Sequence, residues 1–243
     1  MDNEVIEKAL ELEDQGELQE CIKFLDENLK NIQDDLIRSD ALRLLSECHL
    51  YKENPDLELS RKLAEESLRI ANDNKDEKRT GESYLLLSQI LNQMEDEKAE
   101  EFGRKAMDIF QKINDKENLI YSMISLATII KDFSEASKLF EKSLKESENS
   151  NDLDMMAQAA VNYAYLLLEE KGGDEPLKVL DRAIDKIIKQ GAQLKRKNER
   201  IEFVNNYSEI FDAASDIAME LDQYDLATKY ASYLNKDPQE GKK

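Results

Sequence analysis

Very few side chains in this sequence have the chemistry for catalysis or metal binding. The only histidine, His49, directly follows Cys48, and the only other cysteine is Cys21. Neighbouring residues on a helix point about 100° apart, so Cys48 and His49 do not form a catalytic pair by themselves. The two cysteines also lack the C-x-x-C spacing of metal ligands. The segment GGDEP at 172–176 is too short for a phosphate-binding loop. We therefore predict no catalytic residues, no metal and no cofactor.

The composition is acidic, with 34 Lys and Arg residues against 54 Asp and Glu residues and a net charge of −20. A field of this sign repels phosphate backbones and attracts basic protein segments. We therefore expect a protein or peptide partner, with a basic segment favoured, and no nucleic acid. The sequence has no signal-peptide pattern and no run of the roughly 20 apolar residues that a membrane span needs. These features predict a cytoplasmic protein without membrane association.

Long helices must position any functional side chain, because helix breakers are scarce, with 7 Gly and 3 Pro. Segments that each open on a matched position, usually a small residue, recur along the chain. Successive matched positions are 39, 39, 37 and 40 residues apart, and the last step is 51. Small residues at regular positions allow two helix backbones to approach closely. The matched positions are Cys21, Ser60, Ala99, Ala136, Pro176 and Ala227.

An apolar helical pattern precedes each of these segments, so the chain reads as pairs of a first and a second helix. Breaks rich in Asn and Asp separate the pairs, and these residues cap helix starts. We predict an all-α fold with a single domain over 1–243, built from about six stacked helix pairs. The predicted repeats are 1–33, 35–73, 76–114, 116–149, 152–191 and 195–235, followed by a polar tail at 236–243. Within this pattern Cys21 and Cys48 are predicted to be buried thiols, with a reactive or bridging role as the alternative.

The pairs show a pattern of a small residue in the first helix, a Gly/Asp turn about eight residues later and an alanine opening the second helix. With its period near 40, this pattern resembles the longer-helix variety of tetratricopeptide repeats. The segments 64–91 and 140–168 carry the resemblance most clearly. It implies a right-handed α-α superhelix whose first helices line a concave groove that binds peptide segments. The sequence departs from the family in having no Trp, no closing proline and a degenerate first repeat.

The last pair differs from the others, because its longer step predicts a first helix extended by about 11 residues. The simplest interpretation is a long capping helix that covers the apolar face of the last repeat. The segment 197–232 is also similar to the closing helices of tetratricopeptide arrays that precede caspase-like CHAT protease domains. That similarity favours a regulatory role as an alternative.

The repeat phase predicts which side chains line the groove. The anchors of the phase are the small first-helix residues Ser46, Ser88, Ala127, Ala164 and Ser215. Positions three and two before an anchor, and one and four after it, should face the groove, as should some positions six before it. The predicted peptide-binding residues are Gln89, Asn92, Tyr121, Ser125, Thr128, Gln158, Asn162, Tyr165, Glu209, Asp212 and Asp216.

Amides and hydroxyls dominate the centre of this predicted groove and can pair with an extended peptide backbone. An ordinary solvated helix face is the alternative. The resemblance makes Asn162 the leading residue, since an Asn at this position clamps the ligand main chain in similar arrays. The carboxylate clamp of co-chaperone tetratricopeptide domains is missing, because its Lys, Asn and Arg positions hold Ile124, Thr128, Glu209 and Ala213. The acidic residues Glu209, Asp212 and Asp216 instead suit a basic ligand.

A basic run interrupts the acidic sequence near its end. Its members are Lys189, Lys195, Arg196, Lys197 and Arg200. The run is either a contact for an acidic partner or nucleic acid, or a solvated helix face with a hinge at Gly191.

The sequence as a whole predicts a non-catalytic scaffold or adaptor that binds proteins or peptides in a concave groove. Two alternatives stay open. One is a regulatory subunit that controls a single enzyme or sensor, and the other is self-assembly through a terminal repeat. The oligomeric state is not predicted.

Overall fold

The computed structural model describes residues 2–240, and all regular secondary structure among them is helical. The helices are α1 (Asp2–Asp14), α2 (Leu18–Asn28), the 3₁₀ helix η1 (Leu29–Asn31), α3 (Asp35–Tyr51), α4 (Leu57–Asp73), α5 (Glu77–Gln93), α6 (Ala99–Ile113), α7 (Lys116–Ile129), α8 (Phe133–Ser150), α9 (Leu153–Glu170), α10 (Glu175–Gly191), α11 (Lys197–Asn205), α12 (Ser208–Glu220) and α13 (Tyr224–Ala231). None of these helices is both long enough and apolar enough to cross a bilayer.

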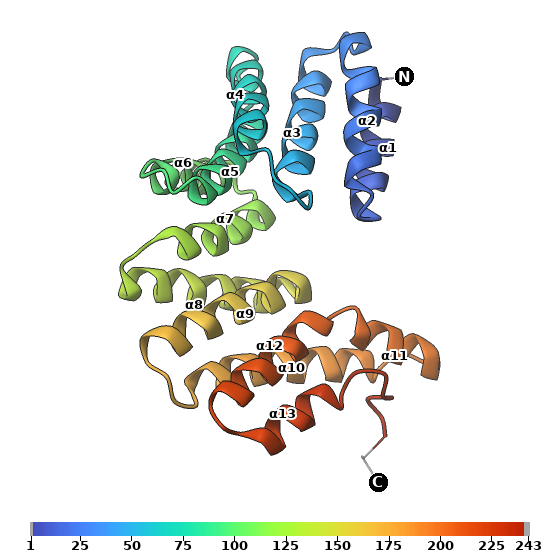
Figure 1. The fold of residues 1–243 in the computed structure, drawn as a ribbon, viewed down its shortest axis with the longest axis vertical. Helices are drawn as coiled ribbons and strands as arrows, with labels where there is room; N and C mark the ends of the chain where they lie inside the picture. The colour runs from blue at the N-terminus through green and yellow to red at the C-terminus, as the bar shows by residue number, and fades with distance from the viewer. Residues whose placement is uncertain (1, 241–243) are drawn as a thin grey trace. The chain divides into compact units, whose positions relative to one another are not determined.

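The chain divides into two compact units, with the boundary between Ile129 and Ile130. Unit 1 contains α1–α7, and unit 2 contains α8–α13 (Figure 1). In unit 1 each helix packs on the next, and the first helices α1, α3, α5 and α7 also contact one another in succession. In unit 2, α9 packs on α8, α10 and α12. First helices that touch in this way form one continuous face within unit 1.

Hydrogen bonds from the small anchor residues set the register between the helices of a pair. The Ser46 hydroxyl donates to the Ser60 carbonyl oxygen at 2.8 Å, and the Ser88 hydroxyl donates to that of Ala99 at 2.8 Å. The equivalent bond in the last pair runs from Ser215 to the carbonyl of Ala227 at 3.3 Å. In each pair the acceptor is the residue at the matched position of the second helix. The predicted helix pairing is therefore confirmed.

Aspartate side chains cap the N-termini of many of the helices, as the Asn- and Asp-rich breaks predict. Asp34 accepts hydrogen bonds from two backbone amides at the start of α3, and Asp76 and Asp152 each accept one at the starts of α5 and α9. These bonds satisfy amides that have no partner inside the helix. Asn114 and Asn151 adopt left-handed backbone conformations, both with φ of 56°, where α6 and α8 end. The breaks therefore both end one helix and begin another.

The first helix of the last pair is not one long helix, so that prediction was wrong. α11 ends at Asn205 and α12 begins at Ser208. Both segments pack on α10, and α12 also packs on α9 and α13. The close approach of α11 explains Gly191, since a Cβ there would lie 3.0 Å from the Phe203 ring.

The basic run is only partly a solvated surface, because it anchors the end of the described chain. Arg200 is 8% exposed and forms a bidentate pair with Asp237, with N–O distances of 2.7 and 2.6 Å. Lys197 pairs with Glu240 at 2.7 Å. The pairing holds the pKa of the Asp237 carboxyl at about 2. The predicted polar tail is therefore ordered through 240 by contacts with the basic run, and residues 241–243 lie outside the described part.

Candidate functional site

A cavity of about 670 Å³ opens on the first-helix face of unit 1. Its walls come from α1, α3, α5 and α7. Gln89 of α5 connects the neighbouring helices, because its side-chain oxygen accepts from the Tyr51 hydroxyl at 3.2 Å and its amide donates to the Tyr121 oxygen at 2.9 Å. This chain of hydrogen bonds places two aromatic rings and an amide along one rim. We call this cavity the unit 1 groove.

Half-buried charges line the unit 1 groove beside this rim. Arg43 of α3 donates to both carboxylate oxygens of Glu47, at 2.7 and 2.9 Å, and its Nε lies 3.7 Å from Glu82 of α5. The side chains of Arg43, Glu47 and Glu82 are 22%, 19% and 20% exposed. Glu13 of α1 lies in the same wall. Lys78 of α5 also lies in the lining, with its Nζ 3.9 Å from Glu82. These two cations are outnumbered by the five carboxylates of the lining, so the groove carries excess negative charge.

The pKa values of these carboxyls reflect that excess. Burial, and secondly the charge of Glu47, raise the pKa of Glu13 to about 7. Burial also raises the pKa of Glu47 and of Glu82, although Arg43 opposes the rise at both carboxyls. A cation entering the groove would favour the ionised forms of all three. The arrangement therefore suits a Lys or Arg side chain, which could also lie against the Tyr51 and Tyr121 rings.

A second cavity, of about 550 Å³, lies on the first-helix side of unit 2. It brings together Gln158 and Asn162 of α9 with Glu209 of α12, three of the predicted site residues. Asn206, at the break between α11 and α12, joins them. The Asn162 amide nitrogen donates to the Gln158 carbonyl at 3.1 Å, which leaves its oxygen to accept from a ligand. We call this cavity the unit 2 groove.

The wall of the unit 2 groove also contains Tyr207. Its pKa is raised to about 12 by burial and by hydrogen bonding to Asp154, so its hydroxyl stays protonated and its oxygen can accept from a ligand. Neutral amides and a hydroxyl, with exposed carboxylates at Asp154 and Glu209, give this groove hydrogen-bonding groups for a peptide backbone.

The other predicted site residues have varied positions. Gln89 and Tyr121 line the unit 1 groove, whereas Asn92 and Thr128 are exposed and lie outside its lining. Ser125 is buried, so it offers no accessible side chain. In unit 2, the Tyr165 side chain is 44% exposed, and its partial burial, together with the charges of Asp216 and Glu220, raises its pKa. Asp212 and Asp216 are exposed and do not line the unit 2 groove.

The sequence analysis did not select the charged residues of the unit 1 groove, although the repeat phase contains the signal for most of them. Arg43 lies three before the anchor Ser46, and Glu47 lies one after it. Glu82 lies six before Ser88, the same offset that selects Tyr121 and Gln158. Glu13 was missed because the sequence analysis assigned no anchor to the first repeat. The fully buried Ala9, whose carbonyl accepts from Cys21 at the matched position, is the equivalent residue, and Glu13 lies four after it.

The two cysteines and the histidine, which were considered above as catalytic or metal-binding residues, are buried within the fold. Cys21 and Cys48 are free and fully buried, and the Cys21 thiol donates to the Ala9 carbonyl at 3.4 Å. Burial lowers the pKa of His49. Among residues 2–240 no group of three His, Cys, Asp or Glu side chains is arranged to hold a metal ion.

No family profile matches the chain, and no curated protein matches it in sequence. Solved structures match its fold. One is a Rap protein complexed with Competence and Sporulation Factor, with a TM-score of 0.67 and 14% identity over 93% of this chain and 72% of that one. This chain has a tetratricopeptide-like helical-repeat fold. A STAND protein with a tetratricopeptide repeat sensor from Pyrococcus horikoshii shares this fold, with a TM-score of 0.69 and 16% identity over 94% of this chain and 34% of that one.

A third solved structure consists of kinesin light chain TPR-like repeats from Podosopora anserina, with a TM-score of 0.60 and 15% identity. That match covers 77% of this chain and 95% of the other. The all-α class and the stacking of helix pairs are thus confirmed for this tetratricopeptide-like chain. The low identities mean that the likeness shows the fold alone.

Proposed function

We propose that this tetratricopeptide-like protein is a non-catalytic adaptor that binds an extended, basic segment of a partner protein on its first-helix faces. The observation that carries the proposal is the unit 1 groove, where the carboxylates, Glu13, Glu47 and Glu82 among them, outnumber the two cations Arg43 and Lys78. A ligand cation would neutralise carboxylates that are already partly removed from water, which makes the attraction stronger than at an exposed site. The unit 2 groove supplies amides for a peptide backbone.

The complex of a similarly folded Rap protein with Competence and Sporulation Factor supports a binding role for this kind of fold. The charge of −20 supports a basic partner. A protein-binding role requires no metal or cofactor. A cytoplasmic location is part of the same proposal.

The proposal is tested with two end-capped, fluorescently labelled peptides that differ at one position, Arg in one and Gln in the other. Fluorescence anisotropy should show tighter binding of the Arg peptide. Glu13→Gln should weaken that binding by about tenfold, the effect of one charge-assisted contact. Glu20→Gln removes the same charge from an exposed position of α2 and is the matched control. Equal affinity for the two peptides, or equal loss in both variants, would refute the basic-segment assignment.

A regulatory role is the second candidate, because the similarly folded STAND protein carries its repeats as a sensor. Affinity capture from native extract separates the two roles. A regulatory subunit recovers one partner in stoichiometric amount, whereas an adaptor recovers several.

A further inference from the structure

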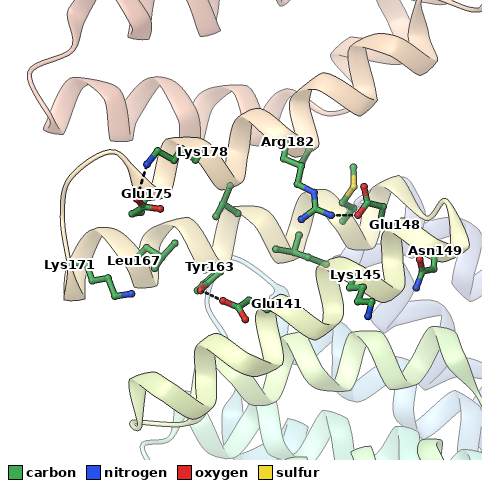
Figure 2. Close-up of a pocket in the computed structure, with 14 residues that line it drawn as sticks. Glu141, Lys145, Glu148, Asn149, Tyr163, Leu167, Lys171, Glu175, Lys178 and Arg182 are labelled. Atoms are coloured by element: carbon green, nitrogen blue, oxygen red, sulfur yellow. Dashed lines mark hydrogen bonds and ion pairs between the residues drawn. The ribbon is translucent and has the colours of Figure 1, made fainter.

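A cavity of about 780 Å³ in unit 2 has no counterpart in the proposed function. It lies between the second helices α8 and α10, with α9 as its floor (Figure 2). The α9 residues in it are Met156, Tyr163 and Leu167, whereas Gln158 and Asn162 of the same helix line the unit 2 groove. The two cavities therefore use different faces of α9. We call this cavity the second-helix pocket.

The base of the second-helix pocket is apolar. Leu144 of α8, Met156 and Leu167 of α9, and Val179 of α10 all line it. Tyr163 completes this surface, with its ring stacked on Phe140 at a centroid distance of 5.5 Å. A cavity of this size and composition can hold an apolar side chain together with the neighbouring backbone of a bound segment.

Every carboxylate of the pocket already has a partner. Glu148 of α8 accepts from Arg182 across the pocket, as Figure 2 shows, and also pairs with Lys186 at 2.8 Å. These two cations lower the pKa of Glu148. The Tyr163 hydroxyl donates to Glu141 at 3.1 Å, and Lys178 pairs with Glu175 at 2.7 Å. The carboxylates are therefore neutralised or hydrogen-bonded from within.

Two ammonium groups of the lining are left without a carboxylate. Lys145 of α8 and Lys171, at the end of α9, have no carboxylate partner among residues 2–240. Lys171 instead lies over the Phe133 ring, with its nitrogen 4.8 Å from the centroid. Both are available to a ligand at the rim of an apolar surface. This local positive excess contrasts with a chain of net charge −20.

We propose that the second-helix pocket binds an acidic segment of a partner protein, in which carboxylates flank an apolar side chain. The apolar side chain packs on Leu144, Met156 and Val179, and the flanking carboxylates pair with Lys145 and Lys171. A ligand carboxylate can also replace Glu175 as the partner of Lys178, because an exposed ion pair of this kind contributes little free energy. The rest of the acidic surface repels such a segment, which confines it to this pocket. Unit 2 would then carry a binding site separate from the first-helix faces of the proposed function.

The test uses an end-capped, fluorescein-labelled peptide of sequence Glu-Glu-Leu-Glu-Glu, with two comparison peptides. In one the glutamates are replaced by Gln, and in the other the Leu is replaced by Ser. Fluorescence anisotropy at low salt should show the tightest binding for the first peptide, and added salt should weaken it. Equal affinity for the Glu and Gln peptides would overturn the proposal.

Paired variants locate the binding. Lys145→Gln together with Lys171→Gln should weaken binding by about tenfold, since each ion pair contributes up to about fivefold in affinity. Lys138→Gln together with Lys142→Gln removes the same charge from exposed positions of α8 outside the lining, and should change affinity less than about twofold. All four substituted side chains are exposed, so a thermal melt should show little change in stability. Equal losses in both double variants would overturn the assignment.

A site-specific signal completes the test. With methyl-labelled methionine, the Met156 resonance should shift on addition of the acidic peptide, whereas that of Met155, which lines the unit 2 groove, should not. A shift at Met155 alone would contradict the proposal. Tighter binding of a single-stranded oligonucleotide than of the peptide, lost in the Lys145/Lys171 variant, would reassign the pocket to nucleic acid.

Discussion

The grooves of unit 1 and unit 2 use the same repeat positions for different chemistry. Six residues before the anchor, α5 carries Glu82, which contacts Arg43, and α9 carries Gln158 beside Asn162. The position in unit 1 is a half-buried charge, and that in unit 2 is an exposed neutral amide. The backbone scaffold is alike, so the difference comes from the side chains alone. It teaches that one fold can present a groove lined by interacting charges and a groove lined largely by neutral amides in a single chain.

The strongest way to break this comparison is to remove the guanidinium from the unit 1 groove. Arg43→Met should lower the free energy of unfolding by about 2–3 kcal/mol, because Glu47 loses its counter-charge in a half-buried site and Glu82 keeps only the more distant Lys78. Chemical denaturation near neutral pH measures the effect. Arg182→Met in unit 2 is the control, since Arg182 is 61% exposed and its ion pair should contribute less than about 1 kcal/mol. Similar losses in both variants would show that the charges of the two units do not differ in environment.

A second prediction tests the shared repeat phase on which the comparison depends. Ala99 in unit 1 and Ala136 in unit 2 occupy the matched position and are both buried. Ala99→Leu and Ala136→Leu should each destabilise the protein by roughly 1–3 kcal/mol through overpacking. Lys142→Leu, at an exposed position of α8, should change stability by less than about 0.5 kcal/mol in a thermal melt. If Ala99→Leu or Ala136→Leu left stability unchanged, the repeat phase assigned to that unit would be wrong.

The third prediction sharpens the difference in pH dependence. The pKa of Glu13 is raised from an ordinary value of 4.5 to about 7, so the folded state holds more protons than the unfolded state between these values. The free energy of unfolding should therefore fall as the pH rises from about 4.5 through 7, by about 1–2 kcal/mol once solvent screening at this partly exposed carboxyl is allowed for. Denaturation curves across that range measure the fall.

Glu13→Gln should flatten this part of the stability profile. The interacting charges on neighbouring elements, Arg43 and Glu47 of α3 and the adjacent Asp14 of α1, remain in that variant. An unchanged profile would show that Glu13 titrates at an ordinary pKa. Binding of the Arg peptide should also be tighter at pH 8 than at pH 6, because only the ionised carboxyl attracts it.

The smallest expected effect concerns the unit 2 groove. Asn162→Ala removes one hydrogen-bonding amide from a largely exposed site, and should weaken partner binding by about fivefold, or roughly 1 kcal/mol. The melting temperature should change little. Calorimetry of binding beside a thermal melt separates the two quantities. Parallel losses of affinity and stability would remove Asn162 from the binding surface.

Some of these features followed directly from residue types and spacing. Ser46, Ser88 and Ser215 were predicted as anchors because small side chains recur at one helical position, and their hydroxyls bond to the matched carbonyls. The positions of Gln89 and Asn162 came from the same phase. The ion pair of Arg200 did not follow from the sequence. Arg200 lies in a basic run that resembles a solvated helix face, and its partner Asp237 lies 37 residues away.

The sequence by itself determined the helical pairs, their order and the neutral character of the predicted central residues. These depend on local propensity and on a repeating period, and both are written in consecutive residues. Only the tertiary structure decided that Glu13 joins Glu47 and Glu82, that the last pair breaks between Asn205 and Ser208, and that Lys145 and Lys171 edge one pocket. The physical reason is that burial and charge pairing between helices depend on distances in space. A repeat pattern does not specify these distances when the residue types at equivalent positions vary from one helix pair to the next.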